Sequence, residues 1–169
     1  MKRSILLYAS LGGLFIASEA AAQAGVLARD GITLAGSSRP LTFGEPQADV
    51  LARAASSLGG PPTQAREAGC RNGDFDLASW TTGLTLVFKQ GRFVGWLADR
   101  RLPADYVSRA GIGFGRTVAD MKRGNAGLIL SDAPQGRQFG FDGMWGEVRQ
   151  PGDVASLDSL RSGETCSRR

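Results

Sequence analysis

The sequence predicts an α+β fold of two pseudo-repeats, each a short helix followed by antiparallel strands, with the helices packed on one face of the sheet. Two observations predict this fold. The stretch LTFGEPQADV at 41–50 returns as IGFGRTVADM at 112–121, so a Phe-Gly turn precedes an Ala-Asp pair in both copies. After each copy come short apolar runs separated by turn residues, which is typical of antiparallel strands.

The duplication divides the chain into a first helix-plus-hairpin half at 25–99, a connector at 100–110 and a second half at 111–169. Together the halves are expected to form one compact domain. The first helix should run from about Pro46 to Leu58, because its apolar residues recur at helical spacing and Gly-Gly-Pro-Pro follows. The second helix should begin after Thr117, which can cap it, and end near Arg123.

The strongest local signal is a β-hairpin. GLTLVFK at 83–89 and RFVGWLA at 92–98 flank Gln90-Gly91, a pair suited to a two-residue turn. Regular pairing across that turn puts Thr85 opposite Trp96. Because side chains alternate between faces, one face should pack in the core and the other should stay open. The open face would carry Trp96, Val87, Val94, Lys89 and Arg92, and the alternative for Trp96 is a second layer that covers it.

That face is the predicted partner-binding patch, because aromatic residues and arginine are enriched at binding hot spots. Trp80 and Trp145 are interpreted as core residues, although the pattern does not settle their exposure. Further strands are expected at 31–35, 75–80, 127–131, 138–141, 144–149 and 154–157. The stretch 63–74 is expected to be irregular.

The beginning of the chain predicts export. Lys2 and Arg3 precede an apolar run, and small residues near Ala22 fit a cleavage site that would leave Gln23 or Gly25 first. We therefore expect a signal peptide at 1–22 and a periplasmic or secreted protein. The apolar run is shorter than the ~18 residues of a spanning helix, so no stable membrane anchor is expected after cleavage.

Two cysteines are present, Cys70 and Cys166. In an oxidising compartment such an isolated pair favours a disulfide, here closing a loop of about 97 residues. The alternative is two free thiols with a redox role, but the sequence has no C-x-x-C motif.

The composition argues against several kinds of chemistry. The chain has no histidine, which removes histidine-based hydrolysis and most zinc sites. The net charge is only +4, without a basic stripe among aromatics, so no nucleic-acid partner is expected. Asp74 and Asp76 are interpreted as solvated loop acids rather than calcium ligands, and Gly111–Gly115 as a turn rather than a dinucleotide loop. No catalytic residues, metal or cofactor are predicted.

The motifs FGEPQADV, LGGPP, Trp80 and GLTLVFKQGRFVGW resemble the SmpA/OmlA (BamE-like) fold. Two such units in tandem in an exported protein look like the β-lactamase-inhibitor-protein architecture. The resemblance covers 41–99 and, less fully, 111–166, and it implies non-catalytic protein binding through a sheet surface. This chain lacks the lipid-accepting cysteine of the members that assemble outer-membrane proteins.

The leading functional hypothesis is an exported, non-catalytic protein that binds another protein in the envelope or outside the cell through an open sheet face. Two alternatives stay open. One is a small secreted hydrolase that uses carboxylates alone, for which Asp99 and Glu147 are candidates that the sequence does not place. The other is a purely structural envelope component.

Overall fold

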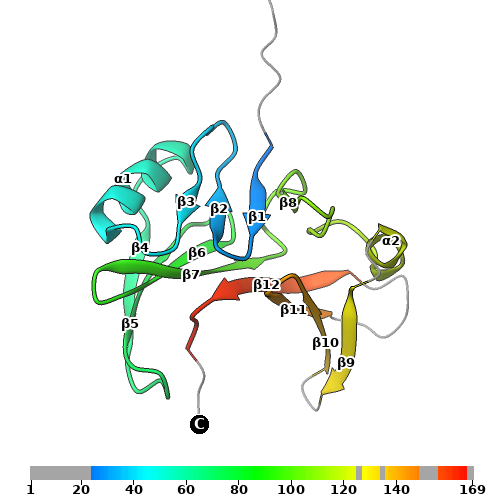
Figure 1. The fold of residues 1–169 in the computed structure, drawn as a ribbon. Helices are drawn as coiled ribbons and strands as arrows, with labels where there is room; N and C mark the ends of the chain where they lie inside the picture. The colour runs from blue at the N-terminus through cyan, green and yellow to red at the C-terminus, as the bar shows by residue number, and fades with distance from the viewer. Residues whose placement is uncertain (1–23, 125–126, 134–135, 149–155, 167–169) are drawn as a thin grey trace, which may run out of the picture.

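A computed structural model describes residues 24–124, 127–133, 136–148 and 156–166, and it consists mainly of β-strands (Figure 1). The strands form two sheets. The larger has eight strands in the order β4-β5-β6-β7-β12-β11-β10-β9, and the smaller has four in the order β3-β2-β1-β8. The predicted signal peptide at 1–22 lies outside the described residues.

The strands of the larger sheet are all antiparallel to their neighbours. They are β4 (Thr63–Glu67), β5 (Phe75–Ser79), β6 (Leu84–Lys89), β7 (Arg92–Asp99), β9 (Ile129–Ala133), β10 (Gly136–Phe141), β11 (Met144–Val148) and β12 (Leu157–Gly163). β4 lies in a stretch that we predicted to be irregular, so that prediction is wrong. β12 begins at the residue where the last predicted strand was expected to end.

The smaller sheet is built from very short strands. They are β1 (Val26–Ala28), β2 (Gly31–Thr33), β3 (Leu41–Thr42) and β8 (Val107–Ser108). β1 pairs with β2 in the antiparallel sense and with β8 in the parallel sense. β8 lies within the segment 100–110, for which only a connector was predicted.

The predicted α+β arrangement, with helices packed on one face of the sheet, is wrong. The four-stranded sheet covers that face instead, and α1 (Gln47–Ser57) and α2 (Val118–Gly124) lie on either side of it (Figure 1). The physical reason is size, because the helices have 11 and 7 residues and each buries only two side chains. Those are Val50 and Ala54 in α1, and Val118 and Met121 in α2.

The main core lies between the two sheets. Leu27, Ile32 and Leu41 of the smaller sheet belong to one buried cluster with side chains from the larger sheet. Those partners are Leu84, Leu86, Phe88, Phe93, Trp96, Ala98, Phe139, Met144, Val148, Leu157 and Leu160. The larger sheet therefore has one face in the core and a second face directed away from it.

Each helix is followed by four strands of the larger sheet. α1 precedes β4 to β7 and α2 precedes β9 to β12, and the two sets meet where β7 pairs with β12. The beginnings of the helices differ. Thr117 and Asp120 cap α2 reciprocally, since the Thr117 Oγ1 accepts from the Asp120 N–H and the Asp120 carboxylate accepts from the Thr117 N–H. Pro46 precedes α1 without a side-chain cap.

Candidate functional site

The hairpin β6–β7 begins as the sequence predicts and then departs from it. Gln90 and Gly91 both have positive φ, 52° and 71°, as a type I′ turn requires, and Lys89 pairs with Arg92. Beyond Phe88–Phe93 the register shifts, so that Val87 pairs with Gly95 rather than Val94. This β-bulge places one extra residue in β7.

The bulge reverses the faces of the rest of β7. Trp96 pairs with Leu86 and is 0% exposed in the core, where its Nε1 donates to the Ala28 carbonyl oxygen at 2.9 Å. The predicted exposure of Trp96 is therefore wrong, because a one-residue slip moves a side chain to the opposite face. Leu97, the next residue along β7, lies on the other face.

The remaining residues of the predicted patch do not form an open surface either. Val87 is fully buried and Val94 is partly buried, in a second apolar cluster with Phe75. Lys89 is paired with Glu164 at 2.8 Å, and Arg92 donates to the Gly44 carbonyl oxygen at 3.1 Å. The structure thus brings these residues near one another, but it covers two of them and engages the other two in contacts within the chain.

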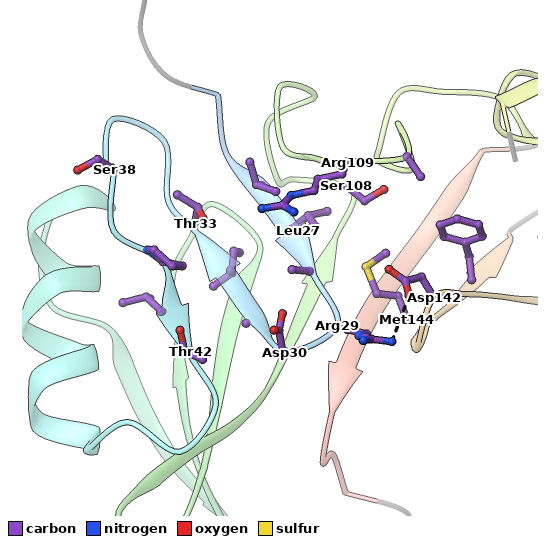
Figure 2. A pocket seen from close by; sticks show the side chains of 18 residues that line it. Leu27, Arg29, Asp30, Thr33, Ser38, Thr42, Ser108, Arg109, Asp142 and Met144 are labelled. Atoms are coloured by element: carbon purple, nitrogen blue, oxygen red, sulfur yellow. Dashed lines mark hydrogen bonds and ion pairs between the residues drawn. The ribbon is translucent and has the colours of Figure 1, made fainter.

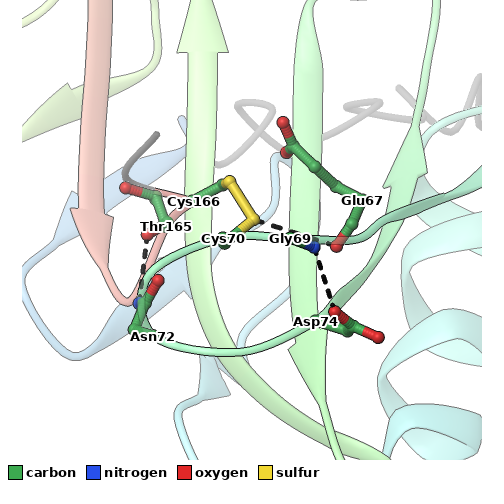
Figure 3. Close-up of a disulfide and its surroundings, with 7 residues drawn as sticks. All are labelled: Glu67, Gly69, Cys70, Asn72, Asp74, Thr165 and Cys166. Carbon is green, nitrogen blue, oxygen red and sulfur yellow. Dashed lines mark hydrogen bonds between the residues drawn. A yellow bond between two sulfur atoms is a disulfide. The ribbon is translucent and has the colours of Figure 1, made fainter. Parts of the chain in front are cut away.

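The covering element is the end of the chain, fixed by the predicted disulfide. Cys70 and Cys166 are bonded with their Cα atoms 5.2 Å apart, which confirms the pairing (Figure 3). Beside the bond, the Asn72 side chain donates to the Thr165 carbonyl oxygen, and the Glu164 N–H donates to the Val94 carbonyl oxygen. Residues 164–166 therefore lie over the apolar cluster on the outer face of β5–β7.

The loop that carries Cys70 is stabilised by an acid. The Gly69 N–H donates to Asp74, and this bond, with the Arg66 guanidinium beside it, holds the pKa of the Asp74 carboxyl below its usual value. Glu67 also lies near the two sulfurs, but sulfurs that are bonded to each other are not available to a metal ion. The geometry here is that of a structural clamp.

The outer face of the second half is open and carries an exposed tryptophan. Trp145 on β11 is 52% exposed and Ile129 on β9 is 64% exposed, and these are the exposed large apolar side chains among the described residues. Residues that pair directly across neighbouring strands have their side chains on the same face of the sheet. The residues that pair in succession with Trp145 therefore form one row across the outer face. We call it the open row, and it consists of Ile129, Gly140, Trp145 and Arg161. Leu97, which continues the row on β7, packs against the covered cluster.

Gly140 explains why the Trp145 ring lies on the sheet. A Cβ at Gly140 would come within 2.8 Å of the Trp145 Cζ3, so the six-membered ring rests directly above that backbone. Only glycine leaves this space, and one side of the ring is thus supported by the sheet. Sequence reasoning missed this site, although the Asp142-Gly143 turn would have placed Gly140 opposite Trp145.

Within the described part of the chain, the two charged neighbours of Trp145 make no ion pair or side-chain hydrogen bond. Arg161 pairs with Trp145 across the strands, and Glu147 lies two residues along β11 on the same face. Among Lys and Arg side chains in described strands of the larger sheet, only Arg161 shows no ion pair or hydrogen bond; among the acids there, only Glu147 shows none. Elsewhere in the sheet the charges are satisfied within the chain, whereas these two are available to a partner.

A hollow lies on the opposite side of the molecule, over the outer surface of the four-stranded sheet (Figure 2). Its volume is about 730 Å³, and β1, β2 and the turn between them line it together with parts of β3 and β8. Arg29 and Asp142 close one side with an ion pair at 3.5 Å, and Arg109 lies at the other (Figure 2). No buried polar group without a partner points into it from the described residues, so it is the weaker candidate.

The chain matches no protein-family model, no curated protein and no solved structure. The resemblance to the SmpA/OmlA (BamE-like) fold and to the β-lactamase-inhibitor-protein architecture therefore stays a prediction. Neither helix in the described part of the chain is long and apolar enough to cross a membrane. The disulfide is compatible with an oxidising, exported location.

Proposed function

We propose that this is an exported, non-catalytic protein that binds another protein through the open face of its eight-stranded sheet. The observation that carries the proposal is the exposed Trp145, supported on one side by Gly140 and flanked by the unpaired Arg161 and Glu147. Tryptophan and arginine are enriched at the hot spots of protein interfaces, and an ordered sheet fixes their backbone positions and so lowers the entropic cost of binding.

The acidic side chains favour binding over the hydrolase alternative. Hydrolysis by carboxylates alone needs one carboxyl with a raised pKa, able to donate a proton. The described carboxyls with a resolved shift are Asp74, Asp99 and Asp120, and each pKa is lowered, chiefly by hydrogen bonds from Gly69, Arg101 and Thr117 respectively. These groups stay ionised and are engaged within the chain.

The proposal is tested by affinity capture from the native envelope and culture fluid. Tagged wild-type protein should retain a specific protein partner, and Trp145→Ala should lose most of that partner while still unfolding in one cooperative transition. Gln64→Ala, an exposed residue on the far edge strand β4, is the matched control and should retain the partner.

Equal recovery by wild type and Trp145→Ala would contradict the proposed face. Recovery of no specific protein by either would favour the structural-component alternative.

A further inference from the structure

The face that carries the open row also carries Glu147, and its charge pattern is complementary to itself. Within its face, Trp145 lies between an unpaired cation on the neighbouring strand and an unpaired anion on its own strand. We propose that the protein bound by this face is a second copy of the same chain, in a two-fold symmetric dimer. This inference rests on the proposed function and names its partner.

The registers set the spacing of the three groups. Neighbouring strands lie about 4.8 Å apart and residues two apart on one strand lie about 7 Å apart. From Trp145, Arg161 is therefore reached across the strands and Glu147 along the strand, in roughly perpendicular directions and at distances that differ by only about 2 Å. The three residues form a corner with Trp145 at its apex.

A two-fold axis follows from that corner. Consider an axis that lies in the plane of the face, passes through Trp145 and bisects the angle between Arg161 and Glu147. Rotation by 180° about this axis exchanges the direction to Arg161 with the direction to Glu147. It places Trp145 on Trp145 of the second copy, and Arg161 opposite Glu147 of the second copy, twice. The strands of the two sheets then cross at nearly a right angle, which is one of the two usual ways in which sheets pack.

Such an interface pairs the two charges that the monomer leaves unsatisfied. Isologous contacts are the commonest in soluble oligomers, and each contact is made twice. The Trp145 ring lies over Gly140, beside the axis, so the two rings lie on either side of the axis and the free side of each packs on the second copy. Ile129 at the edge adds apolar area beside it.

The experiment is sedimentation of the purified protein over a concentration series, with paired charge reversals. Wild type should pass from monomer to dimer. Arg161→Glu and Glu147→Arg should each weaken dimerisation by at least about tenfold, because each places like charges opposite each other twice. Trp145→Ala should weaken it as strongly.

The most direct test is to mix the two charge-reversal variants. Arg161→Glu offers two acids and Glu147→Arg offers two bases, so an equimolar mixture should form a heterodimer that neither forms alone. Arg66→Glu, a reversal on the far edge strand β4, should dimerise like wild type.

A wild type that stays monomeric up to about 1 mM would overturn the inference, and so would a mixture that stays monomeric. If the wild type is monomeric and Trp145-dependent capture of a different protein succeeds, the inference fails and the proposed function stands. If neither self-association nor capture occurs, both fail.

Discussion

The three tryptophans have three different environments. Trp96 is buried between the sheets and bonded to Ala28, and Trp80 is 7% exposed with its Nε1 donating to the Gly60 carbonyl oxygen at 2.9 Å. Trp145 is half exposed on the outer face. Whether a tryptophan in a strand is buried or exposed therefore depends on the register of strand pairing and not on the residue type.

Trp96→Ala should destabilise the protein by about 3–5 kcal/mol, because it opens a large cavity in the core. Urea unfolding followed by circular dichroism measures this change. Trp145→Ala should lower the free energy of unfolding by clearly less, since half of that side chain is already in water. Equal losses for the two variants would contradict the assigned faces.

Burial of Tyr106 predicts a loss of stability in alkali. Burial raises the pKa of its phenol, and the Ala35 N–H donates to its Oη. The folded state therefore keeps the phenol proton after the unfolded chain releases it near pH 10, so stability is full below that pH and falls as pH rises toward the folded pKa.

Free energies of unfolding at pH 9 and 11 test this linkage. The decrease should be smaller in Tyr106→Phe than in wild type, although Tyr106→Phe is less stable at both pH values because it leaves the Ala35 N–H without its acceptor. An identical decrease in the two proteins would assign the alkaline loss to other groups.

At the scale of elements, local signals predicted turns and caps well but not the irregularity within a strand. Gln90-Gly91 has the predicted turn, whereas the bulge that follows breaks the two-residue period that was assumed for the whole of β7. A glycine inside a strand often marks a bulge. Here a side chain at Gly95 would overlap the Glu164 carbonyl oxygen, a contact from a distant segment that no local pattern reveals.

The reciprocal cap of α2 makes a prediction for that helix. Thr117→Ala removes the hydroxyl that accepts from the Asp120 N–H at 3.1 Å, and this should cost about 1 kcal/mol of the free energy of unfolding. Thr117→Ser keeps the hydroxyl and should restore most of it. A loss of equal size in both variants would point to packing of the threonine methyl instead.

At the scale of the whole molecule, the sequence indicated antiparallel strands and the Cys70–Cys166 bond but not the layer that covers the core. Strands of two or three residues, such as β1, β3 and β8, are too short to show a period. Their position is set by Leu27, Ile32 and Leu41 packing on a sheet formed by distant residues. The same limit hid the open row, whose members come from four strands.

The disulfide joins the middle of the chain to its end, across 96 positions. Replacing both Cys70 and Cys166 with serine should lower the free energy of unfolding by about 4 kcal/mol, because the unfolded chain regains the entropy of a long loop. Guanidinium unfolding of the double variant measures this loss. A change below about 1 kcal/mol would show that residues 164–166 are held without the bond.

The central claim is that Trp145 lies in the contact between two copies of the chain, whereas Trp96 lies in the core and takes no part in that contact. Protein labelled with 5-fluorotryptophan gives a fluorine NMR resonance for each of its three tryptophans, assigned from Trp145→Phe and Trp80→Phe. As the concentration rises through the range of self-association, the Trp145 resonance should shift and the Trp96 resonance should not. A constant Trp145 resonance while the protein dimerises would contradict the account.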